Sequence, residues 1–206
     1  GYANSNDFKT YYPTDIMETA GDIIFFWVAR MIMLGLYITG KVPFKVVYLH
    51  GMVLDARGQK MSKSKGNVID PLELMDKYGT DAFRMGLVVG NTPGTSLALS
   101  EDKIRAYKNF ANKLWNIARF VLSSTEGEKL EKNFSAWSEK DALLKKEFTD
   151  VLTDITSDME NLRLYLSAEK LYHYAWHTFA DIILEDSKKI LKEGNVEEIR
   201  SRKQFL

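Results

Sequence analysis

The sequence predicts two fold classes in one chain, an α/β region followed by an all-α helical bundle. Short β-branched runs, most of the glycines and all four prolines lie within residues 1–99. Residues 100–206 instead repeat apolar residues at spacings of three and four, which is typical of one face of a helix. We therefore expect two domains, residues 1–99 and residues 100–206, with the boundary near Leu99.

Composition excludes several functions. Lys plus Arg and Asp plus Glu each total 28, so the net charge is zero and no global field attracts nucleic acid. The chain has no cysteine, which excludes disulfides and thiolate metal sites and fits a cytoplasmic protein. The most apolar stretch, residues 23–38, contains Arg30 and is shorter than the roughly 20 residues of a spanning helix, so we expect no membrane segment.

In the α/β region, a strand–turn–helix unit comes first. Residues 16–20 read as a short buried strand, and Gly21 and Asp22 open a helix over residues 23–38 that Gly40 ends. Residues 46–49 read as a buried parallel strand that continues into His50. A polar loop spans residues 55–67, and Asp70 followed by a proline begins the next helix.

In the helical region, three amphipathic helices are predicted. Ser100 caps the first, Ser138 caps the second, and Ser167 caps the third, which runs over residues 168–193 until Gly194. Three such helices joined by short loops form an α-bundle. Both ends, Gly1 and the uncapped helical pattern at Leu206, look truncated, so we expect the chain to be an internal fragment.

The loop that follows the second strand is strongly basic. It reads Gly58-Gln59-Lys60-Met61-Ser62-Lys63-Ser64-Lys65-Gly66-Asn67. Ammonium and hydroxyl groups between two flexible glycines suit a polyphosphate ligand and the charge of a leaving pyrophosphate. A solvated basic turn, or a patch that touches RNA phosphates without chemistry, explains the same residues. The loop lacks the G-x-x-x-x-G-K-[ST] pattern, so an ordinary P-loop nucleotidase is disfavoured.

A longer run of sequence resembles a known family. Lys60 to Ser64 is the K-M-S-K-S signature of the class I aminoacyl-tRNA synthetases, and residues 50–53, 66–71 and 78–84 resemble the same family around it. The resemblance implies the second half of a Rossmann-like catalytic domain, followed by an α-helical anticodon-binding domain. Residues 22–31 resemble the members specific for valine more than the isoleucine members, and isoleucine or leucine specificity is the alternative.

These enzymes join an amino acid to ATP, release pyrophosphate and pass the acyl group to tRNA, so the resemblance implies ATP, valine and tRNA as ligands. Lys60 and Lys63 are the implied catalytic residues. The implied ATP-binding residues are Asp22, His50, Gly51, Val53, Lys60, Met61, Ser62, Lys63 and Ser64. Asp22 serves equally well as a helix cap. The family pattern T-G-x-D is shifted here to Thr-Ala-Gly-Asp, which puts close approach of the ribose at Ala20 in doubt.

The remaining candidates have structural alternatives. Ile23 and Trp27 are four residues apart and serve as core by periodicity, and only the resemblance makes them a valine pocket. His173 and His177 lack a third ligand, so we predict no protein-bound metal and expect magnesium to arrive with ATP. The implied tRNA-binding residues, each also explained as a solvated charge, are Arg105, Lys108, Lys113, Arg119 and Arg163. An anticodon base could also stack on an aromatic residue such as Trp137 or Tyr165.

The family's H-I-G-H signature and its editing domain do not occur in this chain. The resemblance therefore implies a fragment of a monomeric enzyme that is inactive alone. Two other classes remain open on the residues: a non-catalytic tRNA-binding module that keeps the loop as a phosphate contact, and a helical protein-interaction domain in which the loop is incidental.

Overall fold

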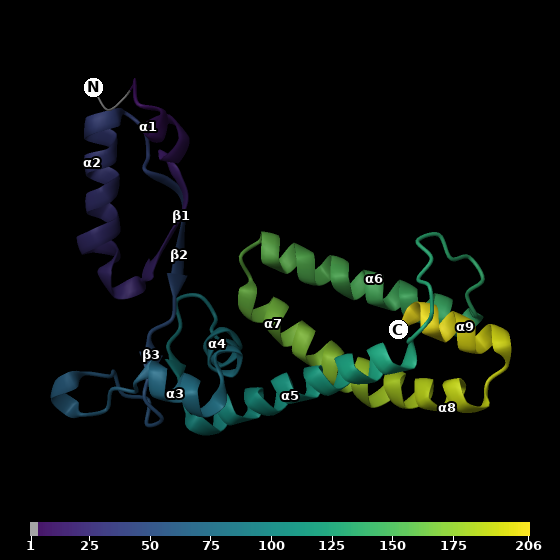
Figure 1. Ribbon diagram of the computed structural model, residues 1–206. Coiled ribbons are helices and arrows are strands. Elements are labelled where there is room, and N and C mark those ends of the chain that lie inside the picture. The colour runs from purple at the N-terminus through teal and green to yellow at the C-terminus, as the bar shows by residue number, and fades with distance from the viewer. Residues whose placement is uncertain (1–3) are drawn as a thin grey trace. The chain divides into compact units, whose positions relative to one another are not determined.

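The computed structural model describes residues 4–206, which divide into two compact units. The first unit runs to Ile69 and includes Asn91–Leu99. The second comprises Asp70–Gly90 and Ser100–Leu206. Figure 1 follows the chain by colour through both units. Each unit is described separately below.

The first unit contains short strands and one long helical segment. Its elements are α1 (Asn6–Tyr11), β1 (Thr14–Ala20), η2 (Gly21–Ile23), η3 (Ile24–Val28), α2 (Ala29–Thr39), β2 (Phe44–His50), β3 (Val53–Leu54), η4 (Lys63–Lys65) and β4 (Leu97–Ala98).

The two longer strands, β1 and β2, pair in parallel. Their register runs from Thr14 opposite Phe44 to Ala20 opposite His50, so the carboxyl ends of both strands lie at one edge. The sequence predicts both strands and their parallel direction, but it also predicts that they are buried. That prediction is wrong for this chain, because a two-stranded sheet leaves Ile16 and Val46 more than one-third exposed.

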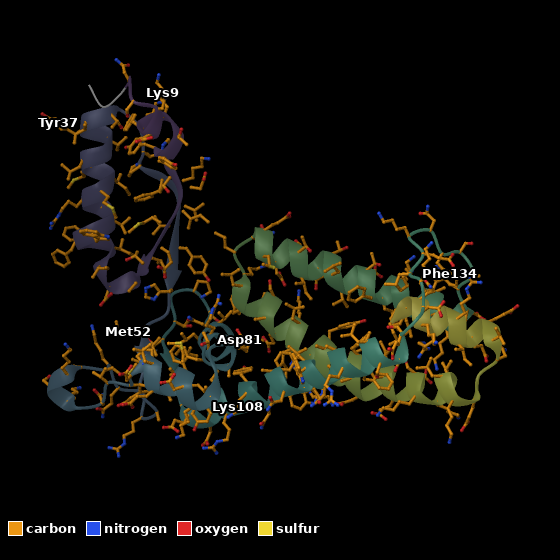
Figure 2. The ribbon with its side chains drawn as sticks, in the orientation of Figure 1. Lys9, Tyr37, Met52, Asp81, Lys108 and Phe134 are labelled. Atoms are coloured by element: carbon orange, nitrogen blue, oxygen red, sulfur yellow. The ribbon has the colours of Figure 1, made fainter. Side chains whose placement is uncertain are left out.

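The helical segment between these strands is irregular at its start. A 3-10 turn (η2) passes into a π-helix (η3) and then into α2, which ends where Gly40 takes a φ of 69°. Much of this segment is exposed, and Tyr37 points away from the strands (Figure 2). Among the described residues, Gly21–Thr39 is the candidate membrane span by length and composition, with 19 residues and a mean hydropathy of 1.7.

A second, smaller pairing lies after β2. The chain from Leu49 to Leu54 runs beside residues 94–99: the Gly94 amide donates to the Leu49 carbonyl at 3.0 Å and the Leu97 amide to the Met52 carbonyl at 2.8 Å. The short strands β3 and β4 pair in parallel within this stretch. This pairing carries the chain into the polar loop that begins at Asp55.

The regular elements of the second unit are all helices in the residues that the structure describes. Its elements are α3 (Pro71–Tyr78), α4 (Thr80–Val88), α5 (Glu101–Ser124), α6 (Glu139–Glu160), α7 (Leu164–His173), η5 (Tyr174–Leu184), α8 (Glu185–Glu193) and α9 (Val196–Phe205). The predicted caps are present at three starts, where the side chains of Asp70, Ser100 and Ser138 accept backbone N–H groups. Helices α3 and α4 belong to the same compact unit as α5, whereas the sequence predicts a single domain boundary near Leu99.

The third predicted helix differs from the structure at its start. Helix α7 begins at Leu164, and Ser167 lies inside it as a buried residue whose hydroxyl donates to the carbonyls of Ile155 and Arg163, each at 3.4 Å. Ser167 is therefore no cap, because the turn at Leu162, with a φ of 59°, already starts the helix. Helix α9 was not predicted as a separate element, although Asn195 and Glu198 form its capping box.

The core of the helical unit combines apolar packing with a buried ionic cluster. Ile104, Phe110, Ile155 and Ile183 are buried, and the Phe110 ring lies 4.7 Å from that of Tyr172. The ionic cluster joins α6, α8 and α9, and α9 packs against both of the other helices (Figure 1). Its members are Asp141, Asp186, Ser187, Ser201 and Arg202.

At the centre of the ionic cluster, the Arg202 side chain has no exposed surface. Its Nε donates to Asp141 Oδ1 at 2.6 Å, and its Nη1 donates to Asp186 Oδ2 at 3.0 Å and to Ser187 Oγ at 2.9 Å. Ser201 Oγ donates to the other oxygen of Asp141 at 2.6 Å. The cluster thus links α6, α8 and α9, while Nη2 of Arg202 is buried with no hydrogen-bond partner among the described residues.

Candidate functional site

The candidate site lies in the first unit, at the carboxyl ends of β1 and β2. Ala20 and His50 are the last paired residues of these parallel strands, so Asp22 and Gly51 follow at the same edge. In open α/β sheets, ligands bind in the crevice at this edge. The fold therefore gathers several of the predicted ATP-binding residues by strand direction alone.

Two of the predicted site residues are in contact there. Lys60 Nζ lies 3.5 Å from Asp22 Oδ2, and both side chains are roughly half exposed or more. These residues are 38 positions apart in the sequence, and the contact shows that the basic loop lies next to the turn that follows β1. Because both groups are solvated, the ion pair is weak enough for a charged ligand to replace it.

His50 is held by its neighbours at the end of β2. Its Nδ1 is 3.0 Å from the carbonyl oxygen of Gly51, and its Nε2 is 3.5 Å from Glu18 Oε1. Glu18 lies on β1 and was not predicted as a site residue, since only the parallel register brings it near His50. The histidine ring thus lies between two oxygen atoms at the strand edge, the Gly51 carbonyl and the Glu18 carboxylate.

Gly51 allows two chain segments to meet. A Cβ atom at this position would lie 1.6 Å from the carbonyl oxygen of Thr95 and 2.6 Å from Asn91 Oδ1. Only glycine fits such a close approach of backbone to backbone. The next predicted residue, Val53, lies in β3 and pairs with Leu97. Gly51 and Val53 therefore build the edge on which the loop begins.

The backbone of the basic loop, residues 55–67, contains two glycines with positive φ and a short 3-10 turn. Gly58 and Gly66 take φ values of 74° and 64°, a region that side chains disfavour, as predicted from their role as flexible flanks. Between them Ser62 Oγ and Ser64 Oγ are 3.2 Å apart, and residues 63–65 form the 3-10 turn η4. Figure 1 shows this loop in blue beside β3.

The two later lysines of the loop are free of carboxylates. Lys63 and Lys65 are exposed, and neither takes part in an ion pair with any residue that the structure describes. Met61 and Ser62 are half-buried, whereas Ser64 is exposed. Ammonium groups without internal partners are the ones that a polyphosphate can engage at least cost.

The proposed amino-acid pocket residues are near Asp22 in the chain. Ile23 is 41% exposed and Trp27 is 51% exposed, so the core interpretation of this pair is wrong for the described chain. Ile23 ends a 3-10 turn and Trp27 lies in a π-helix, so the α-helical spacing that predicts a shared face does not apply. A pocket role stays a prediction for both residues.

Of the five predicted tRNA-binding residues, four have internal partners. Arg105 pairs with Asp102 at 3.1 Å, Lys113 with Asp181 at 2.9 Å and Arg163 with the buried Asp158 at 2.7 Å. Lys108 donates to the Lys77 carbonyl at 3.2 Å.

The fifth residue, Arg119, is exposed on α5. It lines a shallow hollow of about 700 Å³ with Asn116, Phe120, Leu122, Ser123 and Glu126. Among the described residues it forms no ion pair, so its guanidinium is the most available of the five.

The predicted aromatic and histidine candidates are also placed. Trp137 packs edge-to-face on Phe134 at 4.8 Å and lies under the Lys145 ammonium at 4.7 Å, and Tyr165 is half-buried on α7. The rings of His173 and His177 are 5.5 Å apart. Across residues 4–206 no group of three potential metal ligands occurs, and the prediction of no protein-bound metal stays a prediction.

Both parts of the chain match families of known proteins. A family model described as tRNA synthetases class I (I, L, M and V) matches residues 1–100, and a model described as the anticodon-binding domain of tRNA ligase matches residues 141–205. Valine--tRNA ligase of Clostridium tetani is 41% identical over 91% of this chain and 22% of its own length. The Thermus thermophilus enzyme is 42% identical over 98% of this chain and 23% of its own length.

Solved structures share the fold. LeuRS of Agrobacterium radiobacter K84, in a ternary complex with tRNA and LeuAMS, has a TM-score of 0.72 at 20% identity, covering 94% of this chain and 25% of that one. Mycobacterium tuberculosis methionyl-tRNA synthetase in complex with methionyl-adenylate has a TM-score of 0.76 at 23% identity, covering 98% of this chain and 40% of that one.

Residues 1–100 therefore belong to the class I tRNA synthetases, residues 141–205 match the anticodon-binding domain of tRNA ligases, and the predicted fold class is confirmed. It is the later part of a Rossmann-like catalytic domain followed by a helical anticodon-binding domain. Within this family, its sequence is similar to valine--tRNA ligases over more than nine-tenths of its length, and it spans about a fifth of theirs.

Proposed function

We propose that this chain is the part of a valine--tRNA ligase that stabilises the leaving pyrophosphate and begins the docking of tRNA. The observation that carries the proposal is the basic loop at the carboxyl edge of β1, with Lys60 on Asp22 and with Lys63 unpaired among residues 4–206. Similarity to valine--tRNA ligases supports valine as the amino acid. Because the chain spans about a fifth of those relatives, the activity is that of a longer protein.

The reaction explains why lysines are needed. The valine carboxylate oxygen attacks the α-phosphorus of ATP, the bond from that phosphorus to the bridging oxygen breaks, and pyrophosphate leaves with the electron pair. Negative charge grows on the leaving phosphates, so preorganised cations there lower the barrier. Lys63 is proposed to contact the leaving group and Lys60 the same phosphates from the start of the loop. Magnesium comes with ATP and is held mainly by phosphate oxygens.

Asp22 is proposed to bind the ribose. Its carboxylate can accept hydrogen bonds from both ribose hydroxyls at the end of β1. In the described structure the same carboxylate contacts Lys60 at 3.5 Å. We propose that ATP replaces this ion pair, with the ribose on Asp22 and the phosphates on Lys60. His50, Gly51 and Val53 are proposed to form the adenine side of the site, together with Met61, Ser62 and Ser64 in the loop.

The amino-acid pocket and the tRNA contacts are proposed from the exposure and charge of their residues. Ile23 and Trp27 present exposed apolar surface next to Asp22, which suits the small side chain of valine. Arg119 is proposed as a tRNA phosphate contact because its guanidinium is exposed and unpaired within the described residues. Arg105, Lys108, Lys113 and Arg163 are proposed only as secondary contacts, since each already has an internal partner.

We further propose a monomeric, cytoplasmic enzyme with no membrane segment. The apolar segment Gly21–Thr39 falls within the match to the synthetase family model, which supports a role as a helix of the catalytic domain.

The test is amino-acid-dependent exchange of pyrophosphate into ATP by the full-length protein. We expect exchange with valine and much less with isoleucine or leucine. Exchange that prefers isoleucine or leucine would assign a different member of the family. Binding of tRNA with no exchange for any amino acid would favour a non-catalytic tRNA-binding module. The isolated 206-residue chain should show no exchange, because only part of the catalytic domain is in it.

A further inference from the structure

The side chain of Asn67 closes the basic loop. Asn67, at the end of the loop, is half-buried and makes three hydrogen bonds. Its Oδ1 accepts from the Ser62 amide at 2.9 Å, and its Nδ2 donates to Asp55 Oδ2 at 2.8 Å and to the Lys60 carbonyl at 3.3 Å. The amide orientation follows from these partners, because only nitrogen can face both oxygens.

Asp55, at the other end of the loop, is equally well bonded. Its Oδ1 accepts from the amides of Arg57 at 2.9 Å and Gln59 at 2.8 Å, and its own amide donates to the Gln59 carbonyl at 2.9 Å. The Gln59 amide and then the Asn67 side chain lower the pKa of the Asp55 carboxyl, so it is ionised at neutral pH. Asp55 therefore organises the first turn of the loop and offers its second oxygen to Asn67.

We propose that Asp55 and Asn67 act together as a clasp that positions the catalytic lysines. Asn67 holds the backbone on both sides of Met61, at the Lys60 carbonyl and the Ser62 amide, and Asp55 anchors Asn67 to the end of β3. Both side chains are engaged in bonds within the loop, so we assign neither of them a contact with the phosphates. Both are positioning residues, and the inference rests on the proposed function of Lys60 and Lys63.

The physical reason is preorganisation. A loop with two glycines at positive φ and exposed lysines samples many shapes unless internal bonds restrict it. A charge-stabilising donor contributes to the rate only when it is already in place as charge develops. The clasp supplies this order while leaving the ammonium groups of Lys63 and Lys65 unpaired among the described residues. Loss of the clasp should therefore slow adenylation more than it weakens binding of ATP.

The geometry allows a reciprocal exchange as a test. Asn67→Asp alone places two carboxylates against each other, and Asp55→Asn alone places two amide nitrogens against each other. In the double variant D55N/N67D, the amide at position 55 donates to the carboxylate at position 67. The Ser62 amide still has an acceptor, and the Arg57 and Gln59 amides still have the oxygen at position 55. The bond to the Lys60 carbonyl is lost, and a carboxylate oxygen at position 67 now faces that carbonyl oxygen.

The experiment measures kcat and KM for ATP in valine-dependent pyrophosphate exchange by the full-length protein and its variants. Each single variant should lower kcat by about 10-fold to 100-fold, the cost of a small misplacement of a catalytic group, with a smaller change in KM. The double variant should be at least about threefold faster than either single variant, since the pair between positions 55 and 67 is re-formed with opposite polarity. Arg57→Lys is the matched control, because it keeps both the backbone amide of Arg57 and the positive charge near Asp55, and it should leave kcat unchanged.

Hydrogen exchange of the loop peptide, measured by mass spectrometry, separates disorder of the loop from unfolding of the protein. We expect faster exchange over residues 55–67 in the single variants and recovery in the double variant. Unchanged kcat in both single variants, or a double variant no faster than the slower single one, would overturn the clasp. Absence of valine-dependent pyrophosphate exchange in the unsubstituted protein would instead overturn the proposed function.

Discussion

Charged side chains are used in opposite ways in the basic loop and in the helical unit. Lys63 and Lys65 of the loop are exposed and unpaired within residues 4–206. In the helical unit Arg202 is fully buried between Asp141 and Asp186, and Asp158 binds both Arg163 and Lys170. Charges that are satisfied internally hold helices together, whereas charges without internal partners remain available to a ligand. A net charge of zero conceals this difference.

The largest expected effect is on the free energy of unfolding, through the buried ion pair of Arg202 with Asp141. Arg202→Met leaves Asp141 almost fully buried without its main partner, and breaking such a pair costs about 3 kcal/mol or more. Urea unfolding of the chain, followed by far-ultraviolet circular dichroism, should show this loss in the free energy of unfolding. The matched control is Arg200→Ala, whose ion pair with Glu131 is exposed and should contribute less than about 1 kcal/mol. Equal losses in the two variants would remove the distinction.

The next effect concerns the unpaired charges. In the full-length protein, Lys63→Ala should lower the rate of adenylation by about 100-fold, the scale for one preorganised charge-stabilising donor. Lys65→Ala, in the same turn and equally exposed, should lower it only severalfold because it is not in the implied catalytic pair. Single-turnover formation of the adenylate measures both variants. A Lys63→Ala protein with a nearly normal rate contradicts the assignment.

A smaller effect is expected for tRNA. Arg119→Ala should weaken tRNA binding by about threefold to tenfold and reduce its dependence on salt, as for the loss of one phosphate contact. Lys113→Ala should change binding less, because its ammonium is bonded to Asp181 at 2.9 Å. Filter binding at several salt concentrations tests the pair. A larger effect of Lys113→Ala than of Arg119→Ala would show that an internal ion pair does not keep a charged side chain from binding tRNA.

The smallest effect is a pH dependence of stability. Hydrogen bonds from Lys170, and then from Arg163, hold the pKa of the Asp158 carboxyl below its ordinary value. A lowered pKa in the folded state adds stability above the unfolded pKa of about 4, and this stability is lost as the pH falls through the folded value. The melting temperature should therefore fall in this acid range and not near neutrality.

Asp158→Asn is the variant that isolates this effect. The slope of melting temperature against pH below about 4 should be shallower in Asp158→Asn than in the unsubstituted chain. An identical slope in both proteins would mean that Asp158 does not contribute to the acid transition.

The parts of the fold that depend on neighbouring residues could be predicted from the sequence. The caps at Asp70, Ser100 and Ser138 need only a side chain and an amide two or three residues later. Long-range features could not be predicted. Arg202 and Asp141 are 61 residues apart, and only the packing of three helices brings them together. Ser167 fails as a predicted cap because the turn at Leu162 starts the helix earlier.

The candidate site divides in the same way. The basic loop could be predicted from its own residues, and the role of Asp22 from the resemblance to the family. The contact between Lys60 and Asp22 required the parallel pairing of β1 with β2 and the path of the loop. Glu18 near His50 and the clasp of Asp55 with Asn67 were missed for the same reason, because periodicity does not show which polar groups meet across a loop.

The most direct test of the central claim is protection of individual lysines by ATP in the full-length protein. An amine-reactive reagent labels exposed lysines, and mass spectrometry reads the rate at each position. With ATP, magnesium and valine present, labelling of Lys60 and Lys63 should slow by about tenfold or more, the ratio for occupancy of a site at ten times its Kd, while labelling of Lys192 on α8 stays constant. Equal labelling of Lys63 with and without ATP would show that the loop does not contact the triphosphate.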